Sequence, residues 1–278
     1  HGTLGWIYLI CGEYKTAKYH FDQFQNISCQ INQRDLELGR LMNWVSYNKE
    51  LGDYESAQSY YEQVIQIWDE MEDQEHKANI TFDLSLFKHQ LGDNQAALEL
   101  SRDGLRILGD QKRHKVRTNG LTYLGHALTE LGELAEAEEV YIQSLSLCHE
   151  THRPRQAIEA QAGLARVHMA RGVTEQALTQ VYKILAYMEA NTPPKGSSFC
   201  LDGTEEPFRI LLTCYHALKA NDDNRADVIL TDAYNLLQER ADNISDEHLR
   251  GCFLNNVAAN REIVGEYEAL GLENSLRS

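Results

Sequence analysis

The chain has 278 residues, enough for one long repeat array or for two ordinary globular domains. Its formal net charge of −16 argues against nucleic acid as the main partner, because phosphate binding requires a basic surface, and it suits basic partners. No apolar run approaches the roughly 20 residues of a membrane-spanning helix, and no secretory signal is visible, so we expect a cytoplasmic protein without a membrane partner.

A seven-residue phrase recurs along the chain. It is clearest at 131–137, LGELAEA, and its relatives place glycines at 40-residue steps, at Gly12, Gly52, Gly92, Gly132 and Gly172. A fixed period in this range indicates stacked structural repeats. Glycine tolerates the left-handed conformation that ends a helix, and the acidic residue that often follows can lie at the start of the next helix. Each phrase is therefore predicted to be the elbow of a helical hairpin.

Five predicted repeats fill residues 1–190. In chain order we place them at 1–31, 34–72, 74–109, 116–151 and 155–190, and the first is truncated. The chain has no initiator methionine, and His1 already lies inside the first predicted helix. We therefore expect a piece of a longer protein, with more repeats or another domain upstream.

The period breaks after residue 190. Residues 191–207 are rich in Pro, Gly and Ser and predict an inserted loop, which we interpret as a packing flap; the alternative is a functional loop. Residues 208–241 read as a degenerate sixth repeat, with Asn221 in place of the elbow glycine and Ala226 at the alanine position. Residues 242–278 are predicted to be one capping helix and a tail, because terminal repeats need a cap with one polar face.

The residues around the elbows resemble tetratricopeptide repeats. The segments 121–128, LTYLGHAL, and 137–141, AEEVY, follow the family pattern W-x-x-L-G-x-x-Y, then A-x-x-x-F. The units at Gly52 and Gly92 depart from it, and the family's terminal proline is absent. The resemblance implies an all-α, right-handed solenoid of helical hairpins. Because the period exceeds the usual repeat of about 34 residues, we expect longer helices or wider connections.

A second resemblance covers the C-terminal third. The segments 201–209, LDGTEEPFR, and 252–263, CFLNNVAANREI, resemble the C-terminal repeat regions of large bacterial signal-transduction ATPases of the STAND class and related regulators. Members often carry a proline where Ala258 stands here. The resemblance implies that the repeats are the sensor and autoinhibitory arm of such a protein. An upstream domain of the same polypeptide, such as an NTPase, would then be a partner.

The sequence carries no motif of enzyme chemistry. G-x-x-x-x-G-K-[ST], G-x-S-x-G and H-E-x-x-H are all missing. Cys148, His149 and His152 form the densest metal-like group, but a closed zinc site needs four ligands, so we interpret them as ordinary side chains at a helix end. The six scattered cysteines, with no C-x-x-C pair, are typical of reduced thiols. We expect no catalytic residue, no cofactor and no metal.

The concave groove of such a solenoid is lined by the first helix of each hairpin. Positions counted back from each elbow glycine give aromatic, amide, imidazole and charged side chains, a mixture that can hold an extended peptide or a helix through a few anchors. The candidate partner-binding residues are Trp6, Asn43, Ser46, Lys49, Phe82, Asp83, Leu86, His89, Tyr123, His126, Glu130, Arg166, Met169 and Tyr215. The alternative is that they form a solvated inner face or pack against a missing domain of the same protein.

Three functions remain open from the sequence. The preferred hypothesis is a non-catalytic solenoid that binds a protein or peptide in its groove, as the regulatory arm of a larger bacterial signalling protein. The second is a small-molecule sensor, in which Phe82, Tyr123, His126 and Arg166 form a pocket. The third is a structural module whose ends associate with other copies.

Overall fold

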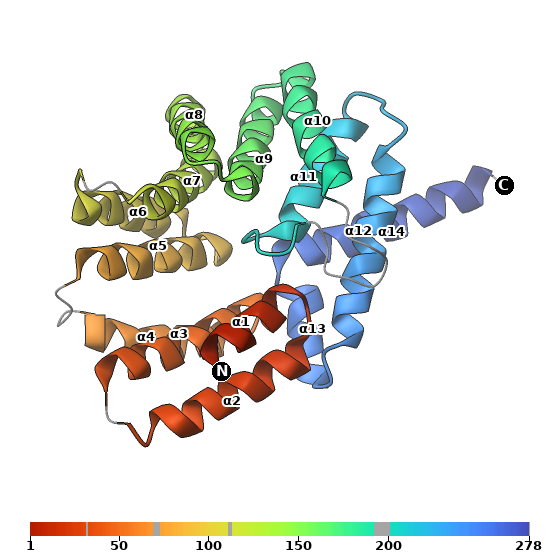
Figure 1. Ribbon diagram of the computed structural model, residues 1–278. Coiled ribbons are helices and arrows are strands. Elements are labelled where there is room, and N and C mark those ends of the chain that lie inside the picture. The colour runs from red at the N-terminus through yellow and green to blue at the C-terminus, as the bar shows by residue number, and fades with distance from the viewer. Residues whose placement is uncertain (32, 69–72, 111–112, 192–200, 278) are drawn as a thin grey trace. The chain divides into compact units, whose positions relative to one another are not determined.

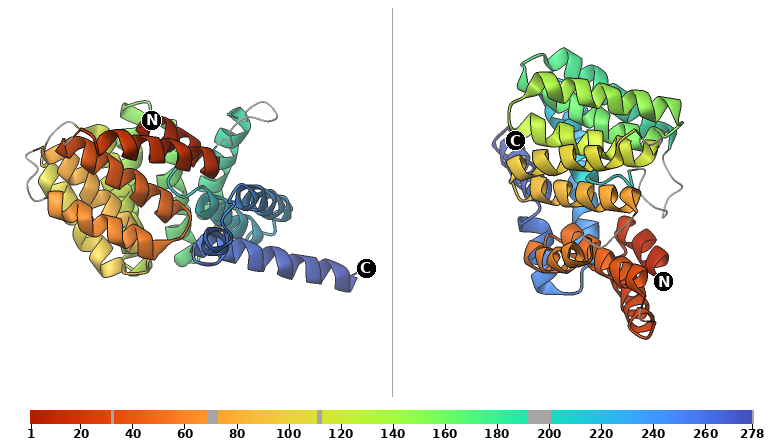
Figure 2. Two further views of the ribbon diagram at one scale, coloured as in Figure 1. Left: turned by 90° about the horizontal axis from the view of Figure 1, so that it is seen from below. Right: turned by 90° about the vertical axis from the view of Figure 1, so that its left-hand side faces the viewer.

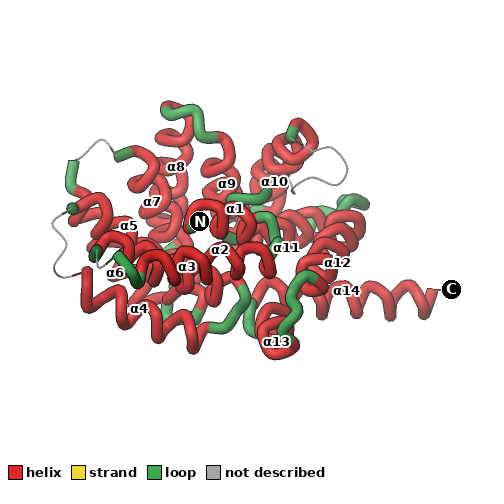
Figure 3. Tube along the Cα trace, turned by 60° about the horizontal axis from the view of Figure 1, so that its bottom comes forward, coloured by secondary structure: helices red, strands yellow, loops and turns green. Residues whose placement is uncertain are grey.

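The computed structural model describes residues 1–31, 33–68, 73–110, 113–191 and 201–277, and these residues form fourteen helices and the loops between them (Figures 1 and 3). Compact packing divides the chain into two units. Unit 1 comprises His1–Met71 and Asp232–Ser278, and unit 2 comprises Glu72–Thr231. The all-helical fold predicted from the elbows is confirmed.

Most helices pair into hairpins. The helices are α1 Gly2–Ile10, α2 Tyr14–Ser28, α3 Arg34–Glu50, α4 Tyr54–Trp68, α5 Gln74–Gln90, α6 Asn94–Leu108, α7 His114–Glu130, α8 Leu134–Glu150, α9 Pro154–Ala170, α10 Thr174–Ala190, α11 Pro207–Lys219, α12 Ala226–Asp242, α13 Glu247–Asn255 and α14 Ala258–Arg277. Helices α3 to α10 have 15 or 17 residues. Three residues form each of the five glycine elbows, and residues 220–225 separate α11 from α12.

The elbow glycines have the predicted backbone conformation. All five have positive φ, from 70° at Gly52 to 81° at Gly92. At the fourth elbow the amide of Glu133 donates to the carbonyl of Leu128 at 2.9 Å, and the amide of Gly132 donates to that of Thr129 at 3.1 Å. This pair of bonds is the glycine-dependent motif that satisfies the last carbonyls of a helix.

Unit 2 is built in two layers of helices. In the first layer α5 packs against α7, α7 against α9, and α9 against α11. Helices α6, α8 and α10 form the second layer and pack against the first (Figures 1 and 2). Aromatic rings fill glycine gaps between the helices. The Phe82 ring occupies the space where Gly104 and Gly120 would carry a side chain, and the Tyr141 ring does the same at Gly163. Close packing of helices against these rings fixes the spacing of the repeats.

The sixth elbow differs from the predicted one by one residue. Asp222, not Asn221, has the positive φ of 53°, and the amide of Asp223 donates to the carbonyl of Leu218 at 3.0 Å as at the glycine elbows. Short polar side chains such as Asp tolerate this conformation better than most non-glycine residues. Of the predicted loop at 191–207, residues 192–200 lie outside the described residues, and Leu201 and Asp202 are buried.

The prediction of one capping helix and a tail at 242–278 is wrong, because the structure has two helices there, α13 and α14. The side chains of Asn260 and Arg261 in α14 donate to the carbonyls of Phe253 and Asn255 at 2.9 and 2.7 Å. These bonds satisfy carbonyls that the end of α13 leaves without helical partners. The break therefore does not leave the backbone of α13 unsatisfied.

These C-terminal helices pack on the elbows of the first two repeats. In unit 1 the side-chain amide of Asn243 donates to the carbonyl of Gly12 at 3.4 Å, and that of Asn256 donates to Gly52 at 3.0 Å. The rings of Tyr14 and Phe253 lie 5.8 Å apart. The segment therefore contacts the N-terminal hairpins through their elbow backbone. Among the described helices, none combines the length and apolar character needed to cross a membrane.

Candidate functional site

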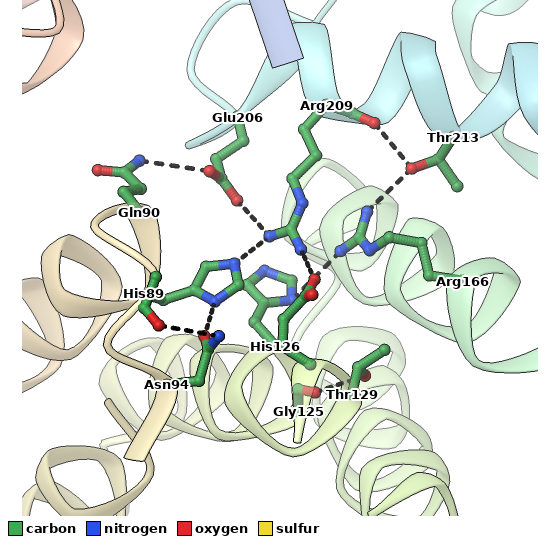
Figure 4. Close-up of polar contacts among 12 residues, drawn as sticks. His89, Gln90, Asn94, Gly125, His126, Thr129, Arg166, Glu206, Arg209 and Thr213 are labelled. Atoms are coloured by element: carbon green, nitrogen blue, oxygen red, sulfur yellow. Dashed lines mark hydrogen bonds and ion pairs between the residues drawn. The ribbon is translucent and has the colours of Figure 1, made fainter. Parts of the chain in front are cut away.

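A polar cluster forms in unit 2 where α11 begins (Figure 4). Pro207 starts the helix, and Arg209 in its first turn donates to Glu206 at 2.9 Å and to Glu130 of α7 at 2.8 Å. The same guanidinium contacts the ring of His89 in α5. One arginine thus joins three helices of the odd-numbered layer. We use the name polar cluster for His89, His126, Arg166, Glu206 and Arg209.

His89 is held as a neutral acceptor. Its Nε2 lies against the Arg209 guanidinium, which can only donate, so the ring proton is on Nδ1. Nδ1 then donates to the side-chain oxygen of Asn94 at 2.7 Å. Burial and the nearby positive charge of Arg209 lower the pKa of His89 from 6.5 to about 4. The ring is therefore uncharged at neutral pH.

His126 has the opposite tautomer. Its Nδ1 accepts from the guanidinium of Arg166 at 3.2 Å and lies 2.7 Å from the hydroxyl of Tyr141. The proton of the neutral ring is therefore on Nε2. Burial, and then the charges of Arg166 and Arg209, hold the pKa of His126 well below its usual range. Arg166 also donates to the hydroxyl of Thr213 in α11 at 3.0 Å.

The Tyr141 hydroxyl reaches His126 through a gap lined by glycines. Tyr141 belongs to α8, in the other layer, and a side chain on Gly125 would lie 2.6 Å from its ring. A side chain on Gly163 would also overlap the ring. Small residues at these two positions of α7 and α9 let an aromatic residue pass between the helices and meet the polar cluster.

Two carboxyl groups, those of half-buried Glu206 and buried Glu159, have opposite electrostatic environments. Burial alone would raise the pKa of Glu206, but Arg209, then His89 and Arg166, lower it to about 2. Glu159 of α9 is 8% exposed and forms no ion pair among the described residues. Burial, and then Glu206 and Glu205, raise its pKa to about 8. Glu206 is thus ionised and Glu159 largely protonated at neutral pH.

Several buried polar atoms around the cluster have no hydrogen-bond partner among the described residues. They include the Tyr123 hydroxyl, Nε2 of His126, Oε2 of Glu159, Nε of Arg166 and Oε1 of Gln90. Arg166, like Glu159, forms no ion pair among these residues. A buried polar group without a partner costs about 1–3 kcal/mol, so such groups usually bind water, an ion or a ligand.

A metal ion fits this position poorly. One ligand atom each from His126, Glu159 and Glu206 lie within 4.8 Å of one another. A metal needs a lone pair on the imidazole nitrogen, but Arg166 donates to Nδ1 and leaves the proton on Nε2. Arg209 already neutralises Glu206 at 2.9 Å. These three side chains are therefore better suited to a ligand that donates and accepts hydrogen bonds than to a metal ion.

The structure brings together four of the predicted binding residues: His89, His126, Glu130 and Arg166. Tyr123 lies beside them, with its ring centroid 6.2 Å from that of His126. The remaining predicted residues of unit 2 are Asp83 and Met169, which are half-buried, and Phe82, Leu86 and Tyr215, which are buried.

Phe82 and Leu86 are not groove residues, since both lie in the hydrophobic core of unit 2. The prediction placed Phe82 in the groove from its position along α5 alone. It did not take into account Gly104 and Gly120 of the neighbouring helices, which leave space for the Phe82 ring between the helices. Tyr215 is 3% exposed and its hydroxyl accepts from Lys219 at 2.7 Å. In unit 1, Trp6 is exposed, and Asn43, Ser46 and Lys49 are half-buried.

Counting positions back from the elbow glycines did not find Glu159, Glu206 and Arg209, which surround or contact the predicted residues of the cluster. Glu206 and Arg209 lie before and within an irregular repeat with no elbow glycine, so the 40-residue period does not reach them. Glu159 lies two turns before Arg166 on the same helix, outside the positions counted. The available signal was the segment 201–209, LDGTEEPFR, whose two acidic residues, proline and arginine mark a charged helix start.

Comparisons with known proteins agree with the repeat pattern. Tetratricopeptide-repeat models match residues 39–110 and 120–154, so repeats of this kind are present in both stretches. No curated protein matches the sequence. The resemblance of the C-terminal third to STAND-class regulators therefore stays a prediction.

Several solved structures share the fold. BtubC (BKLC) from P. vanneervenii is 15% identical with a TM-score of 0.56, over 82% of this chain and 90% of that one. A Rap protein complexed with Competence and Sporulation Factor is 12% identical with a TM-score of 0.62, over 89% and 80%. Aspartyl phosphate phosphatase F from Bacillus subtilis is 12% identical with a TM-score of 0.57, over 87% and 62%. At these identities the likeness concerns the fold alone.

Proposed function

We propose that this chain is a non-catalytic binding module that takes a polar segment of a protein or peptide at the polar cluster of unit 2. The observation that carries the proposal is a pair of ionisable residues on α9 without an ion-pair partner, half-buried Arg166 and buried Glu159, each with a buried polar atom that has no hydrogen-bond partner among the described residues. A free protein gains nothing from such groups. A ligand that pairs with them recovers the cost of burying them, which gives affinity and specificity together.

The contacts of the cluster suggest how binding is transmitted. Arg209 and Arg166 join α11 to α5, α7 and α9, so a ligand bound among them contacts several repeats at once. Ligand binding would then favour one arrangement of these repeats, provided that its affinity differs between two arrangements. We propose that this shift acts on another domain, as in the regulatory arm of a larger bacterial signalling protein. The C-terminal resemblance supports this role, and the likeness to a Rap protein solved with a bound factor supports the fold's ability to hold a ligand.

A library of random twelve-residue peptides selected on the whole chain tests this function. Tyr123→Phe removes only the unpartnered hydroxyl, so we expect it to keep the fold and to weaken the selected peptides at least threefold. Tyr19→Phe, on an exposed tyrosine of unit 1, is the matched control and should leave affinity unchanged. Selection of no peptide, or equal affinity for all three proteins, would contradict binding at this cluster.

A small-molecule sensor is the second candidate. Four of the predicted binding residues of unit 2 meet in the cluster around Arg209: His89, His126, Glu130 and Arg166. Such a compact arrangement also suits a small polar ligand. Thermal-shift screening with polar metabolites separates the two functions. A metabolite that stabilises the wild type but not Tyr123→Phe, together with failure of the peptide selection, would favour the sensor.

A further inference from the structure

Carboxyl groups gather around the buried Tyr123 hydroxyl in unit 2. Glu159 comes from α9, Asp83 from α5, and Glu205 and Glu206 from the segment before α11, and all four raise the pKa of the Tyr123 phenol beyond the effect of burial. Glu206 pairs with Arg209 at 2.9 Å, whereas Glu159 forms no ion pair among the described residues. The remaining carboxyl groups make this end of the cluster acidic.

Two atoms at its centre lack partners. The Tyr123 hydroxyl belongs to a side chain that is 2% exposed, and Oε2 of Glu159 to one that is 8% exposed. Neither atom has a hydrogen-bond partner among the described residues. An acidic cluster alone would be an ordinary solvated surface, but these two buried oxygens lack partners and can each accept a hydrogen bond from a ligand.

We propose that the partner supplies a basic side chain whose guanidinium or ammonium group binds against Glu159 and the Tyr123 hydroxyl. This inference rests on the proposed function and names the chemistry that its ligand carries. A basic side chain fits because it brings several N–H donors and a positive charge on a flexible apolar stem. Asp83 and Glu205 are more exposed than Glu159 and add negative charge near the Tyr123 hydroxyl.

Binding of a cation must be coupled to the charge of Glu159. The groups that face this carboxyl are Tyr123, His126, Arg166, Glu205, Glu206 and Arg209. With its pKa near 8, Glu159 holds a proton in the free protein at pH 7. A guanidinium or ammonium group favours the carboxylate, so the complex releases that proton. A neutral ligand has no such effect.

The test uses the whole chain and four fluorescent nonapeptide pools at pH 7 and 0.15 M salt. Each pool has randomised uncharged flanks around one fixed central residue: arginine, lysine, citrulline or glutamate. Citrulline matches arginine in shape without its charge. We expect the arginine or lysine pool to bind at least tenfold tighter than the citrulline pool, and Glu159→Gln to remove that preference. Glu175→Gln, the same substitution at an exposed position on α10, should keep it.

Calorimetry of the better pool in two buffers of different ionisation enthalpy gives a second readout on the unmodified protein. Release of close to one proton per peptide at pH 7 is expected, and no release would overturn the inference even if Glu159→Gln failed to fold. Equal binding of the arginine and citrulline pools would overturn the inference and leave the proposed function intact. Failure of every pool to bind at 1 mM would contradict both. Tight Zn²⁺ or Mn²⁺ binding that Glu159→Gln abolishes would identify a metal site instead.

Discussion

Tyr141 depends on the absence of a side chain at Gly163. A methyl group there would lie within 3.0 Å of the ring, closer than side-chain carbons approach. Gly163→Ala should therefore lower the free energy of unfolding by about 1–3 kcal/mol, because overpacking outweighs the gain in helix propensity. It should also displace the Tyr141 hydroxyl from His126. Urea unfolding followed by circular dichroism measures the first effect.

Gly251 provides the control for this substitution. It lies within α13 with no atom within 4 Å of an added side chain, so Gly251→Ala should be neutral or stabilising by up to about 1 kcal/mol. Equal destabilisation by the two alanines would show that the gap at Tyr141 is not tightly packed.

The neutral state of His89 gives a pH dependence with a definite sign. The unfolded chain binds a proton at His89 near pH 6.5, but the folded protein does so only near pH 4. Between these values the unfolded state holds more protons, so the free energy of unfolding falls as the pH falls. In the wild type this effect lowers the free energy of unfolding by roughly 2–3 kcal/mol between pH 6.5 and 4, and His89→Gln should abolish that decrease.

The difference between variant and wild type isolates this residue. Glu159 acts in the opposite direction, because its pKa of about 8 means that the folded state holds the extra proton between pH 4.5 and 8. Urea unfolding at pH 7.0, 6.0 and 5.0 measures both slopes. Exposed His149→Gln should keep the wild-type slope. If His89→Gln keeps it as well, His89 is charged in the folded protein.

At the scale of elements, two elbows with the same backbone differ in what covers them. A side chain on Gly52 would lie 2.7 Å from the carbonyl oxygen of Cys252 in α13, whereas Gly132 has nothing within 4 Å, and both glycines have positive φ. Gly132→Ala should lower the free energy of unfolding by about 1–2 kcal/mol, because alanine disfavours the positive φ. Gly52→Ala should lower it by at least about 1 kcal/mol more, because α13 must also move.

Hydrogen exchange localises this extra loss. Gly52→Ala should increase amide exchange in α13, where Asn256 no longer reaches the elbow carbonyl, and Gly132→Ala should not. Unchanged exchange in α13 for both variants would mean that the C-terminal helices are not held by the second elbow.

At the scale of the whole chain, unit 1 is assembled from both ends of the sequence. Its N-terminal hairpins contact the C-terminal segment at Gly12, Gly52 and Tyr14, whose partners are Asn243, Asn256 and Phe253. Removing residues 247–278 should therefore destabilise the hairpins of unit 1 and leave unit 2 folded. Differential scanning calorimetry should show one transition shifted to lower temperature by several degrees and another unchanged. A uniform shift of all transitions would indicate that the two units unfold as one.

Much of this architecture was predictable from local residues. Gly12, Gly52, Gly92, Gly132 and Gly172 required positive φ, and their spacing set the helices between them. The binding residues were harder to predict. Counting back from the glycines found His89, His126, Glu130 and Arg166, because residues at equivalent positions of successive repeats lie side by side in the stack. It misplaced Phe82, whose direction depends on Gly104 and Gly120 in other helices.

The sequence by itself determined the repeat: a 40-residue period, elbows that need glycine, and alternating helices, all of which follow from contacts within one hairpin. Only the tertiary structure decided which charges meet. Arg209 reaches His89 across 120 residues, and Asn256 reaches Gly52 across 204. Such contacts depend on how successive repeats are rotated against each other and on the irregular segment before α11. Neither is encoded in a pattern that repeats, so the polar cluster becomes visible only when the helices are packed.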